Sequence, residues 1–352
     1  MGLLEQTISE IRPVDVQLLE VAQRRLDSLT KPKGSLGRLE DFARRIVAIT
    51  RKETPSVDKK AILVMAGDHG VTQEGVSAYP QEVTRQMVYN FLEGGAGINV
   101  LARHIGARVV VVDMGVAADL EPRRDLVSLK VNHGTRNIVE GPAMTRDEAL
   151  RSITNGIKVF NEEFERGIDI VGTGDMGIGN TTPSSAIASV FTGLSARDVT
   201  GRGTGIDDEQ LETKIKVIER AIELNQPDPD DPLDVLAKVG GFEIGGLAGV
   251  VLAAASKRIP MVIDGFISGA GALIATELAP RAKDYIFAAH RSAEVGHKAL
   301  LERMGLDPIL DLNMRLGEGT GAVLAMNLIE AGVKVLSEMA TFSSAGVSER
   351  LQ

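Results

Sequence analysis

Hydrophobic residues recur every three or four positions through the first fifty residues of the chain, a spacing that places them on one face of a helix. Two such stripes are present: Val14, Leu18, Val21, Ala22, Leu26 and Leu29, then Leu36, Leu39, Phe42, Ala43, Ile46 and Val47. The turn at residues 31–35 separates the stripes and ends on Ser35, a residue type that favours the helix N-cap. The pattern therefore predicts two helices, with Ser35 capping the second.

The pattern changes at Lys60 to short apolar runs that end in Asp, His or Gly, with helical patterns between most of them. The runs stand at residues 61–65, 109–112, 168–171, 261–263 and 285–287. This alternation predicts an α/β fold with a mainly parallel, doubly wound, Rossmann-like sheet and crossover helices. Ligands of such sheets bind outside the carboxyl ends of the strands, so we expect the polar strand tips to form one site.

Helical spacing returns after Gly319 and continues to Met339. The helical patterns at the two ends of the chain could therefore pack together as a second, smaller unit beside the sheet.

Composition excludes several classes of protein. The 352-residue chain has a formal net charge of −9 and 3% aromatic residues, which argues against a nucleic-acid binder with basic patches or stacking rings. It has no cysteine, which excludes disulfides, thiolate nucleophiles and Cys-ligated metals. Residues 1–13 do not resemble a signal peptide, and the apolar stretches 245–256 and 261–279 are too short or too charged to span a bilayer. We expect a soluble, cytoplasmic protein without nucleic-acid or membrane partners.

The first candidate for chemistry is the glycine-rich segment at residues 172–183. It follows an apolar run and leads into a predicted helix, with Thr182 as candidate N-cap and Pro183 at the first helical position. Glycines let backbone N–H groups approach an anion closely, and a helix N-terminus adds favourable partial charge. The segment suits a phosphate, although it matches neither the Walker A nor the dinucleotide motif. A structural turn is the alternative interpretation.

The second candidate is Glu318, which lies between Gly317 and Gly319 just before a helix that Thr320 could cap. A carboxylate on glycine hinges can approach a substrate and act as general base. It can equally complement the helix dipole, and the sequence leaves both interpretations open.

A third candidate is Lys214, which falls on the margin of a helical apolar face, whereas Lys216 points away from it. Lys214 could reach a phosphate past this face or could snorkel to solvent, and both interpretations stay open. Polar strand tips could also bind a metal, but their spacing matches no known two-His motif, so we predict none. These tips are Asp68, His69, Asp113, Asp264 and His290.

The chain resembles the nicotinate-nucleotide–dimethylbenzimidazole phosphoribosyltransferases of cobalamin biosynthesis over nearly its whole length. Six segments in order carry the resemblance: Leu29–Glu40, Asp68–Val71, Met176–Pro183, Lys238–Glu243, Asp264–Phe266 and Arg315–Gly319. Together, in one chain of the right length, they are highly specific.

The resemblance implies a large α/β catalytic domain at residues 60–320 and a small helical domain formed by residues 1–59 and 321–352. It implies a homodimer in which a neighbouring small domain helps to close each site. The implied reaction moves ribose 5-phosphate from nicotinate mononucleotide to 5,6-dimethylbenzimidazole, giving α-ribazole 5'-phosphate and nicotinate. No cofactor is implied.

The resemblance also assigns roles to residues. Glu318 matches the catalytic base. The nucleotide site corresponds to Asp175, Gly177, Ile178, Gly179, Asn180, Lys214, Asp264, Ser292, Leu316 and Gly317. The base pocket corresponds to Ser77, Tyr79, Gln81, Gln86 and Met87.

The chain departs from the family pattern at Asp175, where Glu is expected. The shorter side chain puts one ribose contact in doubt. Two other functions remain as alternatives: a metal-dependent phosphohydrolase that uses the acidic and histidine strand tips, and a nucleotide-sensing module without turnover.

Overall fold

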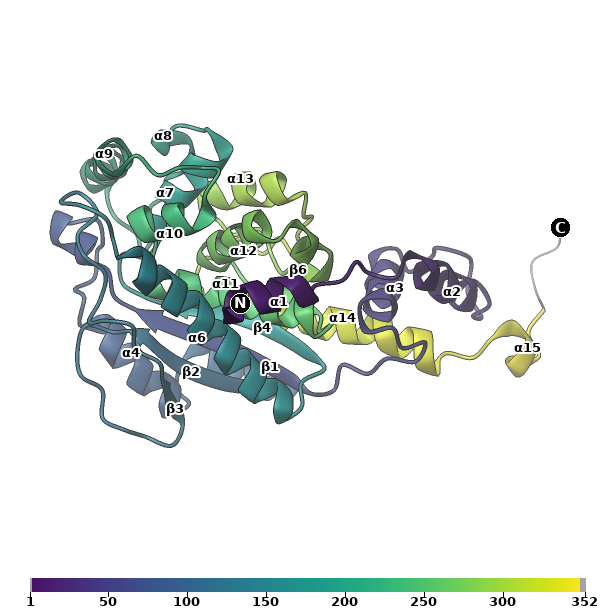
Figure 1. The fold of residues 1–352 in the computed structure, drawn as a ribbon. Coiled ribbons are helices and arrows are strands. Elements are labelled where there is room, and N and C mark those ends of the chain that lie inside the picture. The colour runs from purple at the N-terminus through teal and green to yellow at the C-terminus, as the bar shows by residue number, and fades with distance from the viewer. Residues whose placement is uncertain (1, 349–352) are drawn as a thin grey trace.

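The computed structural model of the chain describes residues 2–348, and its centre is a six-stranded sheet (Figure 1). All neighbouring strands pair in parallel in the order β3-β2-β1-β4-β5-β6, which confirms the predicted doubly wound sheet. The strands are β1 Lys60–Gly67, β2 Arg108–Gly115, β3 Leu126–Ser128, β4 Ile170–Met176, β5 Met261–Ile263 and β6 Ile286–Ala288.

Five of the six strands coincide with the predicted apolar runs, and β3 is the one that the sequence pattern missed. It is three residues long, lies at the sheet edge and leaves its side chains partly exposed, so its burial imposes no distinctive pattern. The strand order reverses direction between β1 and β4, whose carboxyl ends lie side by side. A crevice at such a switch point is the usual ligand site of this fold.

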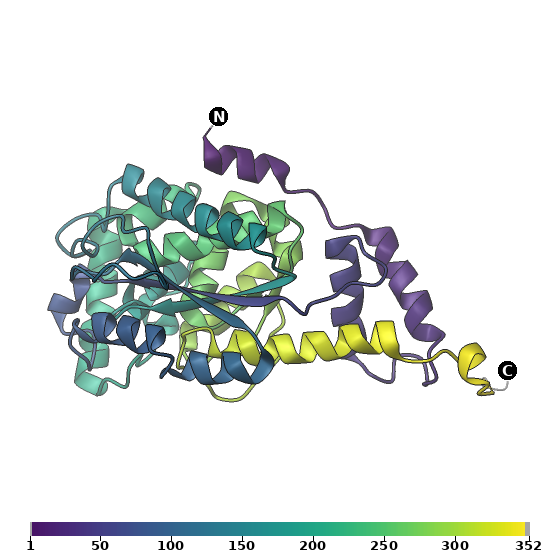
Figure 2. The same ribbon diagram turned by 90° about the horizontal axis from the view of Figure 1, so that it is seen from below.

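Helices cover both faces of the sheet (Figure 2). One face is covered by α6 Arg146–Glu165, α11 Phe242–Ser256 and α12 Phe266–Leu278. The other is covered by α4 Val83–Leu92, α5 Gly97–Ile105 and the first half of α14 Thr320–Glu338. The helices that pack on α12 are α7 Thr181–Thr192, α10 Pro232–Val239 and α13 Val295–Met304, and α8 Ala196–Val199 and α9 Asp208–Asn225 pack on α7. Two short 3-10 turns are η1 Gly70–Glu74 and η2 Pro280–Tyr285.

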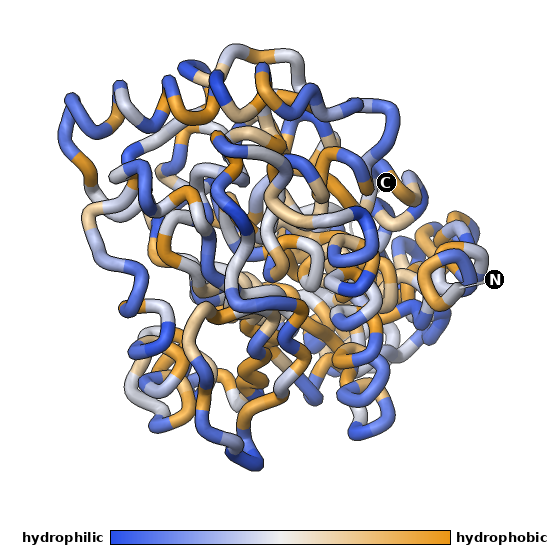
Figure 3. Tube along the Cα trace, turned by 60° about the vertical axis from the view of Figure 1, so that its left-hand side comes forward, coloured by the Kyte–Doolittle hydropathy of each residue, from blue (hydrophilic) through white to orange (hydrophobic). Residues whose placement is uncertain are grey.

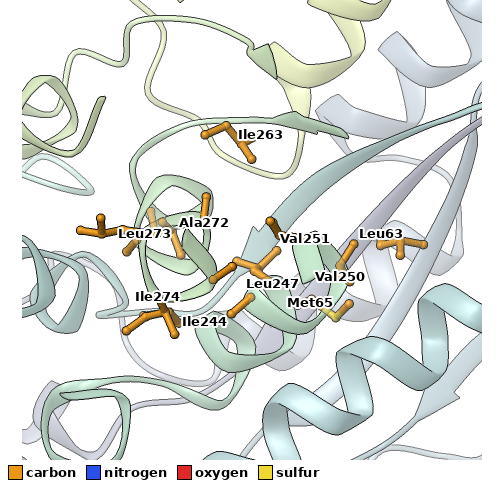
Figure 4. Packing of buried hydrophobic residues seen from close by; sticks show 14 of the residues in the cluster. Leu63, Met65, Ile244, Leu247, Val250, Val251, Ile263, Ala272, Leu273 and Ile274 are labelled. Carbon is orange, nitrogen blue, oxygen red and sulfur yellow. The ribbon is translucent and has the colours of Figure 1, made fainter. Parts of the chain in front are cut away.

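The main core lies between the sheet and α11, which is apolar on all sides and almost wholly buried. Figure 4 shows Leu63 and Met65 of β1 beside Leu247 and Val250 of α11. Hydrophilic positions follow several of the outermost loops (Figure 3). A Cβ at Gly156 of α6 would collide with a carbonyl of α11, so glycine permits the close packing of these two helices.

A second apolar cluster joins the chain-end helices α2 Val16–Asp27 and α3 Arg38–Thr50 to the far half of α14. This cluster lies to one side of the sheet, near α15 Phe342–Ala345 (Figure 1). Its buried members are Ala22, Leu26, Leu29, Ala43, Val47 and Leu336. The first helix, α1 Leu3–Glu10, packs instead on α6 and α11 of the main core. The domain boundaries inferred from the sequence stay a prediction, and residues 1 and 349–352 of the predicted small domain lie outside the described residues.

Ser35 does not cap α3, contrary to the sequence prediction. The helix begins at Arg38, and its N-cap is Gly37, with φ +53° and no side-chain hydrogen bond. Glu40 organises this turn, because its Oε1 accepts hydrogen bonds from the Lys31 ammonium at 2.7 Å and from the Leu36 N–H at 3.0 Å. The side chain that stabilises the turn therefore lies inside the helix.

By length and composition alone, α14 is apolar enough to cross a membrane. Its packing explains the composition, since 56% of the apolar window is buried against the rest of the protein. Core helices of soluble proteins pass the same test.

Candidate active site

The glycine-rich segment forms a tight loop between β4 and α7, pressed onto the end of β1. A Cβ at Gly177 would collide with the carbonyl oxygen of Gly67, so only glycine fits there. Gly179 has φ +88°, which side chains other than glycine rarely adopt. The Ile178 N–H donates to Thr84 Oγ1 at 3.0 Å and ties the loop to α4. The loop is thus held at the switch point of the sheet.

Helix α7 begins two residues earlier than the sequence predicted. Its N-cap is Asn180 and its first residue is Thr181, so Thr182 is not the cap and Pro183 is the third helical residue. The turn starts early because the Asn180 N–H already donates to the Gly177 carbonyl at 3.1 Å. The helix N-terminus therefore lies directly on the glycine loop, as an anion site requires.

Asp175, near the end of β4, is hydrogen-bonded to this loop. Its Oδ2 accepts from Asn180 Nδ2 at 3.0 Å, and its buried Oδ1 has no hydrogen-bond partner among the described residues. Burial raises the pKa of Asp175 well above its usual range, and the charges of Asp264, Glu243 and Glu318 raise it further. An unpaired oxygen at this position is available to a substrate hydroxyl.

A cavity of about 280 Å³ opens beside the loop and brings many of the predicted site residues together. Of the predicted nucleotide set it is lined by Asp175, Gly179, Asn180, Ser292, Leu316 and Gly317. Of the predicted base set it is lined by Ser77 and Tyr79. The other predicted residues do not line it: Gly177, Ile178, Lys214, Asp264, Glu318, Gln81, Gln86 and Met87.

Glu318 lies next to the lining residue Gly317, with only 5% of its surface exposed. Its Oε2 accepts a hydrogen bond from the Ile98 N–H at 3.0 Å, at the start of α5. Burial raises the pKa of Glu318, and the negative charge of Asp264 adds to the rise, whereas the N–H groups of α5 oppose it. A raised pKa suits a carboxylate that accepts a proton near neutral pH.

Lys214 does not snorkel to solvent, because its side chain is wholly buried. Its ammonium donates to Thr181 Oγ1 at 2.7 Å and to the Gly201 carbonyl at 3.3 Å. Burial lowers the pKa of Lys214 to about 8, against an opposing effect of Glu294. Thr181 lines the cavity, so the ammonium lies one side chain behind the cavity wall.

Only part of the segment that was predicted to bind the acceptor base lies at the cavity. Tyr79 lines the cavity and is 54% exposed, whereas Gln86 points to solvent and Met87 is half-buried on α4. Thr84 of this segment holds the glycine loop instead, a role that sequence reasoning missed.

Sequence reasoning also missed the loop at residues 201–205. The Arg315 guanidinium donates to the Gly203 carbonyl at 2.9 Å, and Thr204 Oγ1 accepts from the Ala78 N–H at 3.2 Å. This loop therefore joins two predicted site segments over the cavity. Its three glycines in five residues were the available signal. His290, which was expected at the site only as a polar strand tip, also lines the cavity. Further lining residues outside the predicted nucleotide and base sets are Val76, Thr181, Gly265, Phe266, Ile267 and Glu294.

No group of three or more His, Asp or Glu side chains within residues 2–348 is arranged to hold a metal ion. His69 instead pairs with Glu243, with 2.8 Å between Nε2 and Oε1, beneath the glycine loop. Burial lowers the pKa of His69, but Glu243 and Asp68 together raise it, so the pKa lies above its usual value. A larger cavity, of about 490 Å³, lies between α3 and β6 and is lined by none of the predicted site residues.

A doubly wound parallel sheet with a glycine loop at a helix N-terminus and an adjacent buried carboxylate is typical of nucleotide-binding α/β enzymes. Comparison with known proteins gives the family. A phosphoribosyltransferase family model matches residues 11–347. The nicotinate-nucleotide–dimethylbenzimidazole phosphoribosyltransferase of Geobacter sulfurreducens is 62% identical over 349 residues, 99% of each chain. The enzyme of the same name from Chloroflexus aggregans is 61% identical over 350 residues, 99% of each chain.

A crystal structure of the enzyme of that name from Thermus thermophilus has a TM-score of 0.90 and 45% sequence identity, covering 96% of this chain and 100% of that one. The chain belongs to the nicotinate-nucleotide–dimethylbenzimidazole phosphoribosyltransferase family. The relatives give no support to a metal-dependent phosphohydrolase or a nucleotide-sensing module.

Proposed function

We propose that this enzyme transfers ribose 5-phosphate from nicotinate mononucleotide to 5,6-dimethylbenzimidazole, giving α-ribazole 5'-phosphate and nicotinate for the nucleotide loop of cobalamin. The observation that carries the proposal is Glu318, a buried carboxylate with a raised pKa beside the cavity of the glycine loop. Its hydrogen bond from the Ile98 N–H at the start of α5 fixes the carboxylate beside that cavity.

The chemistry requires one base. One ring nitrogen of dimethylbenzimidazole forms a bond to C1 of the ribose while the bond from C1 to the nicotinate nitrogen breaks. The electron pair of that bond leaves with nicotinate, and the proton on the other ring nitrogen passes to the Glu318 carboxylate. Attack opposite the leaving group inverts the sugar from β to α. Buried carboxylates near C1 stabilise the positive charge that develops on the ribose.

The nucleotide is held by the glycine loop. The N–H groups of Ile178 and Asn180 are already bonded within the protein, so the backbone at Gly179, which lines the cavity, and the N-terminus of α7 suit the phosphate. Lys214 behind Thr181 supplies positive charge. Asp175 offers its unpaired oxygen to a ribose hydroxyl. Ser292, Leu316 and Gly317 complete the wall of the site.

The acceptor base is assigned to the apolar side of the cavity, at Ser77 and Tyr79. Gln81, Gln86 and Met87 lie farther along the same segment and would reach the base only from the outer rim. The neighbouring small domain of a homodimer would cover this rim, since Tyr79 and Leu316 are 54% and 60% exposed.

We assign the enzyme to the cytoplasm and infer no metal or other cofactor.

The test is turnover and binding by the Glu318→Gln variant. The variant should bind nicotinate mononucleotide with normal affinity in calorimetry and should lose roughly a hundredfold or more in turnover with dimethylbenzimidazole, in line with loss of a general base. Glu338→Gln, at the exposed far end of α14, is the matched control and should turn over normally. Near-normal turnover by Glu318→Gln at saturating substrate would show that Glu318 is not the base.

A further inference from the structure

Glu318 has an unusual backbone conformation, and something must maintain it. Its φ is +63°, and its neighbours Gly317 and Gly319 have φ of +80° and +93°. Three successive residues in the left-handed region form a sharp turn, and the middle one carries a side chain that this region disfavours. The direction of the Glu318 carboxylate therefore depends on the contacts that hold this turn.

The principal contact comes from Asp264, which follows β5. Its Oδ2 accepts from the Gly319 N–H at 3.1 Å, and its Oδ1 accepts from the N–H groups of Gly321 at 2.7 Å and Ala322 at 3.1 Å. One carboxylate thus binds three backbone donors of the turn and of the first turn of α14. These are donors that a helix start leaves without backbone partners.

Two further contacts hold the same turn. Thr320 Oγ1 donates to the Gly317 carbonyl at 2.8 Å. On the other side, Gly174 of β4 lies so close that a Cβ there would collide with the carbonyl oxygen of Glu318. The turn is therefore held between Asp264 and β4, and Glu318 projects from it toward the N-terminus of α5.

Asp264 is not placed to contact a ligand. Its side chain has no exposed surface, and it does not line the cavity. The titratable groups around Glu318 are Asp264 after β5, Asp175 on β4 and, beyond Asp264, His290 after β6. From the remaining side α5 presents backbone N–H groups.

We propose that Asp264 is a positioning residue for Glu318: it fixes the turn that carries the base and places a negative charge beside it, and it does not bind the nucleotide. The inference rests on the proposed role of Glu318. It gives Asp264 a role different from the nucleotide contact that the family resemblance implies.

The charge of Asp264 makes the inference testable by pH. Burial raises the pKa of Asp264 itself, while the three N–H groups that it accepts oppose this rise. In its charged form Asp264 raises the pKa of Glu318, so its removal lowers that pKa. The general base then becomes active at lower pH, so the acid limb of the kcat/KM profile moves to lower pH. A residue that acted only through the fold would leave this limb unchanged, and the nucleotide Kd separates positioning from nucleotide binding.

The experiment compares Asp264→Asn, Thr320→Val and Asp113→Asn with the unmodified enzyme, using nicotinate mononucleotide and dimethylbenzimidazole. Asp264→Asn should lower kcat tenfold or more, change the nucleotide Kd less than threefold and move the acid limb to lower pH. Thr320→Val should lower kcat without moving the limb, because it loosens the turn and removes no charge. Asp113→Asn is the matched control, because Asp113 lies two residues before the end of β2 and is buried. It accepts the Val116 N–H at 2.9 Å and pairs with Lys130 at 3.1 Å, and neither contact involves the turn that carries Glu318. Asp113→Asn should have the same kcat and the same acid limb of the kcat/KM profile as the unmodified enzyme.

A tenfold weaker nucleotide Kd with unchanged kcat and an unmoved limb in Asp264→Asn would overturn the inference and make Asp264 a nucleotide ligand. If Asp264→Asn does not fold, Thr320→Val decides, and an unchanged kcat there contradicts a turn held for catalysis. Failure of the unmodified enzyme to transfer ribose phosphate would instead refute the proposed function, so the two failures are distinguishable.

Discussion

At the scale of single residues, the site places titratable groups where water is scarce. Asp175 lines the cavity and Glu318 and Lys214 lie behind its wall, and burial shifts the pKa of each toward the neutral form. Glu318 also adopts a backbone conformation that costs a non-glycine residue roughly 1–2 kcal/mol. Such costs accumulate at functional sites because the surrounding fold compensates for them.

Sequence reasoning selected Glu318 and Lys214 because local signals were visible, namely flanking glycines and the margin of a helical face. It could not see what Asp264 does. Its hydrogen bonds join residues 55 to 58 positions apart in the chain, and no local pattern records such contacts.

Lys214 gives a prediction about both charge and pH. Lys214→Met keeps the aliphatic stem and should weaken nicotinate mononucleotide binding roughly ten- to a hundredfold, the effect of losing a charge-assisted hydrogen bond to phosphate. In the unmodified enzyme the pKa of Lys214 is lowered to about 8, so the charge is present below pH 8 and is lost above it. Nucleotide affinity measured by calorimetry should therefore fall between about pH 7 and pH 9.

Lys216→Met on the exposed side of the same helix is the control and should bind normally. Unchanged affinity in Lys214→Met would leave the buried ammonium with a structural role only, through its bonds to Thr181 and Gly201.

At the scale of elements, apolar runs predicted five strands because buried parallel strands need nearly continuous hydrophobic sequence. The helix starts were predicted less well. Ser35 and Thr182 are good capping residues, yet α3 and α7 start elsewhere. Glu40 fixes the turn before α3 through the Leu36 N–H, and the bond from the Asn180 N–H to the Gly177 carbonyl starts α7 early. Tertiary and medium-range contacts decided these boundaries.

The glycine loop gives the prediction at this scale. Gly177→Ala should displace the loop, because its Cβ would collide with the Gly67 carbonyl oxygen. We expect nicotinate mononucleotide affinity to fall about tenfold, comparable to losing one hydrogen bond to a charged group, while the circular dichroism spectrum stays unchanged. Gly141→Ala has open space around its Cβ and should bind normally. Full affinity in Gly177→Ala would exclude the loop as the phosphate site.

At the scale of the whole molecule, the site depends on segments that are distant in sequence. The loops at residues 77–79, 201–205 and 315–317 meet over the carboxyl ends of β1 and β4, and α14 runs from this site to the second apolar cluster. Sequence pattern indicated that strand tips would converge, because parallel strands share one edge. It could not indicate which loops close over them, since loop paths follow from side-chain contacts.

The central claim is phosphoribosyl transfer with inversion at C1, and analysis of the product tests it most directly. The enzyme is incubated with nicotinate mononucleotide and 5,6-dimethylbenzimidazole, and the nucleotide product is examined by nuclear magnetic resonance. The account predicts the α-anomer of ribazole 5'-phosphate, formed in equal amount with free nicotinate. The β-anomer, or ribose 5-phosphate released without transfer to the base, would contradict it.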